Sequence, residues 1–191
     1  MWLKRILFSA ALMGASSAAA LAKYGPTMLI HGRCHMDECS FTEIVATKTV
    51  GARTGGALIS AVERSAVVKA PMKNGEPQYN LVKPPQYFGI AKVSYAFCST
   101  ERPAFVFYKD GKFYAHVLNV GDSAGVSGFN TDSHLLYWAI CHQKILHEDE
   151  LAGEAVAKQA QELGYHKVPE ADKGQYEFKS RGRMLRFFGL Q

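Results

Sequence analysis

The sequence lacks any long apolar run after its first 22 residues, because Lys, Arg, Asp or Glu interrupts every apolar stretch. A membrane-spanning helix needs about 20 consecutive apolar residues, so we expect no such helix in this part of the chain. Charged residues make up 20% of the 191 residues and hydrophobic residues 48%. This composition is typical of a folded globular protein and excludes disordered and collagen-like chains.

Motifs that carry cofactor chemistry are also missing. The sequence contains no Gly-x-Gly-x-x-Gly, no Walker loop and no His-Glu-x-x-His, so nicotinamide, phosphate and zinc-protease chemistry have no support. Cys-x-x-Cys and Cys-x-x-Cys-His are absent as well, which argues against a thioredoxin-like site and against covalently attached haem. We therefore expect no cofactor.

The first 22 residues have the layout of a secretory signal peptide. Lys4 and Arg5 precede an apolar stretch over 6–14, and small residues follow as far as an Ala-x-Ala ending over 20–22. This pattern predicts cleavage after Ala22 and a periplasmic or secreted protein. The alternative is a membrane anchor, but the apolar stretch is short and rich in Ala and Ser.

All four cysteines lie beyond this leader, at Cys34, Cys39, Cys98 and Cys141. An even number of cysteines in an exported chain predicts two disulfides, for which three connectivities exist. We favour Cys34–Cys39 as a local bridge and Cys98–Cys141 as a long-range bridge. The second pairing is favoured because Cys98 ends an apolar strand and Cys141 lies in an apolar segment.

Positive charge is concentrated at the C-terminal end of the chain. The formal net charge is +5, but two cations lie in the leader and four lie in the last fourteen residues. We expect one globular domain over 23–178 and a basic tail over 179–191. A short basic segment on an exported protein does not indicate nucleic-acid binding. The tail is expected to contact anionic membrane weakly, or alternatively to dock its apolar residues on the body.

The first half of the domain is predicted to be mostly strands. The segments 39–50 and 57–69 are rich in Val, Ile and Thr, and the glycines over 51–56 separate them as a hairpin turn. Four prolines and an Asn-Gly pair make 70–85 a loop. The segment 87–98 alternates apolar and polar residues, which predicts a half-buried strand.

A second hairpin is predicted over 103–120, with Asp110-Gly111 in a two-residue type I′ turn. Counting outward from this turn pairs Tyr108 with Phe113, and aromatic residues fall on both faces of the hairpin. Such a hairpin lies inside a sandwich or in the wall of a barrel, or it offers one aromatic face as a binding platform. The candidate binding residues on that face are Phe105, Phe107, Tyr114 and His116.

The last third of the chain predicts helices. After a glycine-rich loop over 121–132, Asp132 or Ser133 caps a helix over 135–146, and a second helix runs from 149 or 150 to Leu163, with Gly164 after its end. The fold class is therefore α+β: an antiparallel sheet or partly closed barrel, C-terminal helices packed on it, and two disulfides.

Two segments suggest chemistry as alternatives. The loop over 121–125, Gly-Asp-Ser-Ala-Gly, resembles the Gly-Asp-Ser-Gly-Gly nucleophile loop of trypsin-like proteases, although Ala replaces the fourth residue. The resemblance implies a small envelope hydrolase if His31 or His134 lies within hydrogen-bond reach of Ser123. It covers five residues, and the chain is short for the two barrels of that family.

The second alternative is a metal-handling protein. Cys34 and Cys39 flank His35, Cys141 precedes His142, and His31 adds a further donor. Soft ligands would therefore gather if these segments met. Disulfides are favoured over a metal site in an oxidising compartment. The leading hypothesis is an exported non-enzymatic binding protein, such as an inhibitor or immunity-type protein that blocks a protein partner in the cell envelope with a loop or with the aromatic strand face.

Overall fold

The computed structural model describes residues 27–120, 122, 126, 128–169 and 174–190. Seven strands form one antiparallel sheet, in the order β1-β2-β3-β6-β7-β8-β9. They are β1 (Met28–His35), β2 (Glu38–Arg53), β3 (Gly56–Lys69), β6 (Lys92–Cys98), β7 (Ala104–Lys109), β8 (Lys112–Val117) and β9 (Gly174–Phe178). The sheet does not close into a barrel. The predicted leader over 1–22 lies outside the described residues.

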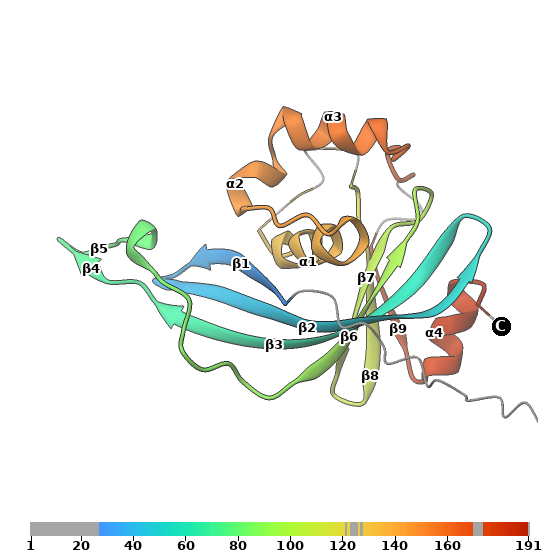
Figure 1. The fold of residues 1–191 in the computed structure, drawn as a ribbon, viewed down its shortest axis with the longest axis horizontal. Helices are drawn as coiled ribbons and strands as arrows, with labels where there is room; N and C mark the ends of the chain where they lie inside the picture. The colour runs from blue at the N-terminus through green and yellow to red at the C-terminus, as the bar shows by residue number, and fades with distance from the viewer. Residues whose placement is uncertain (1–26, 121, 123–125, 127, 170–173, 191) are drawn as a thin grey trace, which may run out of the picture.

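Helices cover both faces of this sheet (Figure 1). The helix α1 (Thr131–His142) packs on one face, and α2 (Glu148–Leu151) and α3 (Glu154–Glu162) lie further out on the same side. The short helix α4 (Arg181–Phe187) packs near β9 and closes a second apolar cluster. No helix among the described residues is long and apolar enough to cross a membrane. The α+β class, with C-terminal helices on an antiparallel sheet, is thus confirmed.

Both predicted hairpins are confirmed. The turn between β2 and β3 falls at Thr54-Gly55, inside the predicted glycine segment, and the two strands are longer than expected. In the β7–β8 hairpin Tyr108 pairs with Phe113, as counted from the turn, and both turn residues have the positive φ that a type I′ turn requires (Asp110 49°, Gly111 78°).

The strand predicted over 87–98 is present but shorter, and the expected half-burial is wrong. The regular strand β6 begins at Lys92, and all four residues over 94–97 are buried. The cause is coverage on both faces, because Ala96 belongs to the cluster under α1 whereas Phe97 belongs to the cluster closed by α4. The same double coverage explains the two apolar faces of the β7–β8 hairpin.

The helix boundaries also differ from expectation. Helix α1 begins four residues early, at Thr131, and ends at His142, because Gln143 adopts a left-handed conformation (φ 53°) that stops the helix. The second predicted helix is two helices, α2 and α3, separated at Ala152-Gly153. Gly164 follows α3 with φ 86°, as its predicted position after the helix requires.

Both predicted disulfides are present. Cys34–Cys39 joins β1 to β2, and Cys98–Cys141 joins the end of β6 to α1. Two disulfides are compatible with an oxidising environment. Because the second bridge ties the sheet to the helix that covers it, it fixes α1 over the first apolar cluster.

Candidate binding surfaces

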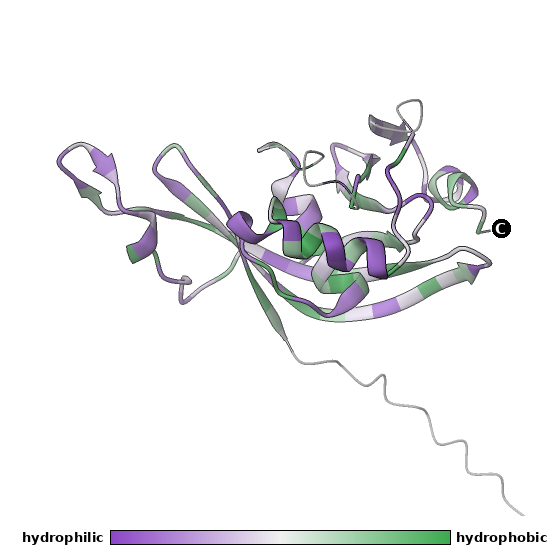
Figure 2. Ribbon diagram, turned by 90° about the horizontal axis from the view of Figure 1, so that it is seen from above, coloured by the Kyte–Doolittle hydropathy of each residue, from purple (hydrophilic) through white to green (hydrophobic). Residues whose placement is uncertain are grey.

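Residues 71–91 connect β3 to β6, and we call them the arm. The arm contains a miniature two-stranded sheet, β4 (Met72–Lys73) and β5 (Glu76–Pro77), and the 3-10 turn η1 (Tyr79–Leu81). The part with β4, β5 and η1 projects from one end of the molecule, and the rest runs back beside β3 to β6 (Figures 1 and 2). Every residue of the arm is described, and none of its side chains is buried. The arm therefore contributes nothing to either apolar cluster of the body.

Large apolar side chains of the arm are exposed instead. Ile90 is 88% and Tyr87 79% exposed, and Met72 and Leu81 are more than half exposed. Val93, just after the arm, is exposed too. Soluble proteins seldom gather large apolar side chains on a surface that has no function, so the arm is a candidate interaction surface.

Local bonds hold the arm in one conformation. The Asn74-Gly75 turn joins β4 to β5, and the amide of Gln78 donates to the carbonyl of Pro71 at 2.8 Å. At the other end the amide of Gly89 donates to the carbonyl of Ser65 on β3 at 3.0 Å. Four prolines restrict the backbone further. A loop ordered in this way loses little conformational entropy when it binds a partner.

A second candidate surface is a cavity of about 390 Å³ beside the Cys34–Cys39 disulfide. The ring of His31 stacks on Phe41, its cross-strand neighbour, with centroids 4.5 Å apart. His31 Nε2 lies 3.4 Å from Cys34 Sγ, and the His147 ring stands edge-on to His31 at 6.3 Å. Sequence reasoning named His31 but missed His147, because no spacing in the sequence links it to β1.

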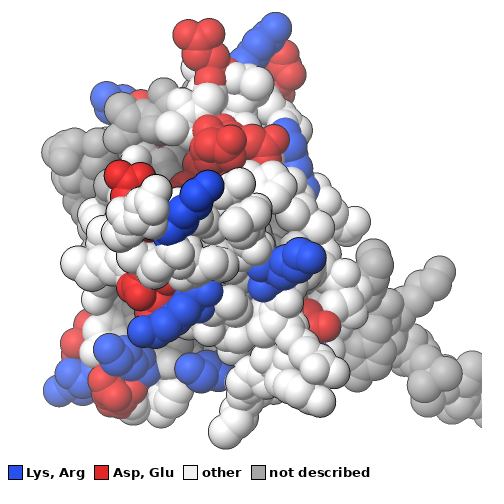
Figure 3. Space-filling model, turned by 90° about the vertical axis from the view of Figure 1, so that its left-hand side faces the viewer, with Lys and Arg blue, Asp and Glu red and all other residues white. Residues whose placement is uncertain are grey.

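Electrostatics keep the His31 imidazole neutral. Burial lowers its pKa below 6.5, and the nearby His147 lowers it further, whereas Glu148 acts in the opposite direction. Glu148 also binds β1 directly, since it accepts from the amide of Cys34 at 3.2 Å and lies 3.8 Å from Arg33 Nε. Figure 3 shows this end of the molecule, where acidic and basic side chains are interspersed.

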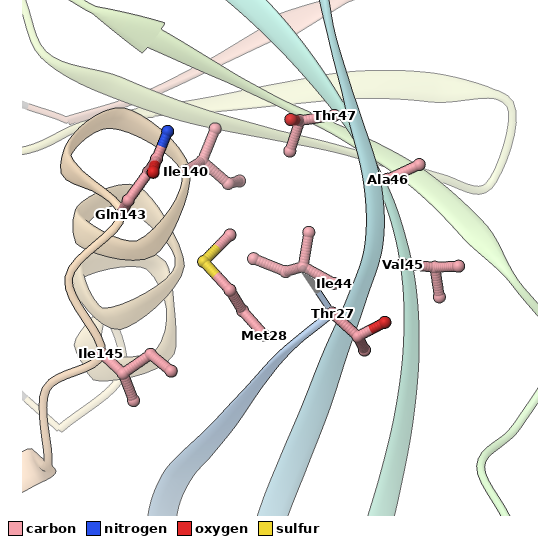
Figure 4. A pocket seen from close by; sticks show the side chains of 9 residues that line it. All are labelled: Thr27, Met28, Ile44, Val45, Ala46, Thr47, Ile140, Gln143 and Ile145. Atoms are coloured by element: carbon pink, nitrogen blue, oxygen red, sulfur yellow. The ribbon is translucent and has the colours of Figure 1, made fainter. Parts of the chain in front are cut away.

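The third surface is an apolar cleft of about 300 Å³ between β1, β2 and the end of α1 (Figure 4). Met28, Ile44 and Ile140 form its wall, and Gln143 and Thr47 supply polar groups. This volume is at the lower limit of small-molecule sites. The cleft has room for a small apolar group.

The aromatic face of the β7–β8 hairpin is largely covered. Phe105 is only 4% exposed and packs in the first apolar cluster. Phe107 stacks on Tyr114 at 5.5 Å, and His116 stands edge-on to Phe107 at 5.3 Å. The binding role proposed for these four residues stays a prediction, and Phe105 has little surface to offer a partner.

His116 also belongs to a hydrogen-bonded array. Its Nδ1 lies 3.3 Å from Ser133 Oγ at the start of α1, and its Nε2 lies 2.6 Å from Gln175 Oε1 on β9. If Nε2–H donates to Gln175, Nδ1 is left as an acceptor for the Ser133 hydroxyl. Ser123, the nucleophile that the protease-like loop suggested, lies outside the described residues.

The cysteines and histidines that the sequence suggested as metal ligands do not all come together in the structure. His142 Nε2 is hydrogen-bonded to Tyr165 at 2.7 Å, in a buried network with Tyr137. His35 is exposed at the end of β1. His31 is the histidine that does lie near Cys34 and Cys39, because one of its ring nitrogens is within 4.8 Å of both sulfur atoms.

The basic tail follows the docked alternative. Residues 181–187 form α4, and Met184 and Phe188 have no exposed surface. Arg53 Nε donates to the carbonyl of Phe188 at 2.7 Å, which attaches the end of α4 to β2. The tail cations are exposed: Lys179, Arg181, Arg183 and Arg186. The apolar stripe of the tail is therefore not available to a lipid surface, and membrane contact through the cations stays a prediction.

Comparison of the chain with protein-family models, with curated proteins and with solved structures found no match.

Proposed function

We propose that this is an exported, non-enzymatic binding protein that docks a protein partner through the arm, as an inhibitor or immunity-type protein does. The observation that carries the proposal is the exposure of large apolar side chains on a locally ordered segment. Preorganised loops with apolar anchors bind partners at low entropic cost.

Charge suggests which partner surface fits. Four lysines, Lys69, Lys73, Lys83 and Lys92, lie on or next to the arm, and Glu76 is its only acidic residue. Lys69 also pairs with Asp37 at 3.9 Å. The partner is therefore a protein with an apolar groove bordered by carboxylates, because rim charges of opposite sign steer association.

The experiment uses the protein as bait in extracts of the native cell envelope, followed by binding measurements with the purified partner. We expect Tyr87→Ser combined with Ile90→Ser to weaken binding at least about 30-fold, since each removes an apolar anchor worth roughly 1–2 kcal/mol. The control is Tyr108→Ser, which changes another tyrosine that is more than half exposed, near the tip of the β7–β8 hairpin.

Tyr114→Ser separates the arm from the aromatic face of the hairpin. Loss of binding in Tyr114→Ser with wild-type binding in the arm variant would contradict the proposal and favour the hairpin. Equal losses in the arm variant and in Tyr108→Ser would also contradict it, because binding would then not depend on the arm.

The Ser133–His116–Gln175 array favours the alternative function, a small hydrolase. In that case His116 is the base for a Ser133 nucleophile and Gln175 orients the imidazole. A fluorophosphonate probe tests this function, because an activated serine forms a covalent adduct with it. Labelling of Ser133 that disappears in His116→Gln would establish the enzyme, and a Ser133 that stays unlabelled would exclude this array as a catalytic site.

A further inference from the structure

The Cys34–Cys39 disulfide lies between two strands that other bonds already hold together. Cys34 and Cys39 are direct cross-strand partners, and Cys39 also pairs with Val68 on β3. The amide of Ala70 donates to the carbonyl of Asp37 in the β1–β2 turn at 2.7 Å. Opening the disulfide therefore leaves the backbone of both cysteines where the sheet places it.

Nitrogen donors surround these sulfur atoms. His31 Nε2 and the two Sγ atoms lie within 4.8 Å of one another. Once the S–S bond is open, all three atoms are therefore close enough to reach one metal ion. Stacking on Phe41 holds the His31 ring in this position. His147 lines the same cavity and is exposed, so rotation of its side chain can bring a second imidazole to the same point.

We propose that reduction of the Cys34–Cys39 disulfide by a dithiol converts this cavity into a zinc site, with Cys34, Cys39, His31 and His147 as the four ligands. Two thiolates and two imidazoles are a common ligand set for tetrahedral zinc. The proposal does not rest on the proposed binding role of the arm. It shares His31 with the donors that the sequence suggested, but His147 takes the place of His35 and His142.

The exchange begins at the sulfur atom that faces the cavity. Cys39 has no exposed surface, whereas Cys34 lines the cavity. A thiolate of the dithiol attacks Cys34 Sγ, the S–S bond breaks and Cys39 leaves as a thiolate. The second thiol of the reductant then displaces Cys34 and closes its own disulfide.

In total the protein disulfide gains two electrons and two protons, and the dithiol loses them. Zinc then replaces the two thiol protons, which are released to solvent.

The second disulfide should remain closed under the same conditions. Cys98–Cys141 links β6 to α1 over 43 residues, and both of its cysteines pack against the first apolar cluster. Differential alkylation and peptide mapping during titration with dithiothreitol measure each bridge separately. We expect Cys34 and Cys39 to be alkylated at a dithiol concentration that leaves the other pair intact.

Zinc affinity is then measured by competition with a chromophoric chelator, and Co²⁺ is used as a spectroscopic probe of thiolate and tetrahedral coordination. We expect the selectively reduced protein to bind Zn²⁺ at least about 100-fold more tightly than the oxidised protein. His31→Gln and His147→Gln should each lose about 10-fold or more. His35→Gln is the matched control and should retain the wild-type affinity.

Cys34→Ser combined with Cys39→Ser removes both thiolates without requiring reduction, and it should bind Zn²⁺ as weakly as the oxidised protein. Circular dichroism of the reduced protein shows whether the sheet persists. Unfolding on reduction, unchanged zinc affinity, or loss of affinity in His35→Gln but not in His31→Gln would each overturn the proposal.

Discussion

His134 should make the fold sensitive to mild acid. It lies on α1 with 1% of its surface exposed, and its Nε2 has no hydrogen-bond partner. Burial lowers the pKa of His134 from 6.5 to about 4. His134 therefore becomes protonated near pH 6.5 in the unfolded chain, but only near pH 4 in the folded protein. Stability is complete above pH 6.5 and falls as the pH decreases between these two values.

The magnitude follows from the two pKa values. Proton linkage with pKa values of 6.5 and about 4 removes about 2 kcal/mol of unfolding free energy between pH 7 and pH 5. Replacing the histidine by an apolar residue, His134→Leu, abolishes this contribution. It also removes a buried polar atom without a partner, so stability at pH 7 should not fall by more than about 1 kcal/mol.

Urea unfolding at pH 7 and pH 5, at constant ionic strength, measures the effect. The burial of His31 and His142 also lowers their pKa values, so the wild type and the variant share these contributions. The difference between their pH slopes isolates His134. His166→Leu, at an exposed position, is the control and should keep the wild-type slope. Equal slopes in His134→Leu and the wild type would refute the reasoning.

Two further predictions concern what holds the fold together. Phe188→Ala should lower the unfolding free energy by about 3–5 kcal/mol, because Phe188 is fully buried and stacks on Phe97 at 4.7 Å; a change below 1 kcal/mol in urea unfolding would mean that α4 is not part of the folded unit. Replacing Cys98 and Cys141 by Ala should cost about 4 kcal/mol, and replacing the two cysteines of the short bridge about 2, since the closed loops differ in length. Equal costs in thermal or urea unfolding would contradict the loop-length argument.

Local signals explain why the hairpins could be predicted from the sequence. Asp110-Gly111 specifies a type I′ turn by itself, and the register of β7 and β8 follows by counting. The edge strands could not be predicted in this way. β9 has the sequence Gly-Gln-Tyr-Glu-Phe, which has little strand preference of its own, and it becomes a strand because it pairs with β8.

The candidate sites, too, could be predicted only in part from the sequence. Prolines and Asn74-Gly75 marked the arm as a loop, but no sequence pattern shows that its apolar side chains lack a covering helix. The two disulfides were predicted because Cys34 and Cys39 are close in the sequence, and because Cys98 and Cys141 lie in apolar segments. The position of His147 beside His31 depends on the path of the chain after α1, which the left-handed conformation of Gln143 redirects.

The arm and the disulfide cavity meet at one residue. Tyr79 belongs to η1 of the arm and also lines the cavity beside His31 and Cys34. A substitution at the proposed zinc ligands can therefore alter the arm through Tyr79. Substitutions at Tyr87 and Ile90 should not alter the zinc site, because these two residues do not line the cavity. Arm variants consequently test partner binding without touching the zinc ligands. Loss of partner binding in His31→Gln would report coupling through Tyr79 rather than a shared site, since His31 is only partly exposed and lies on β1 rather than on the arm.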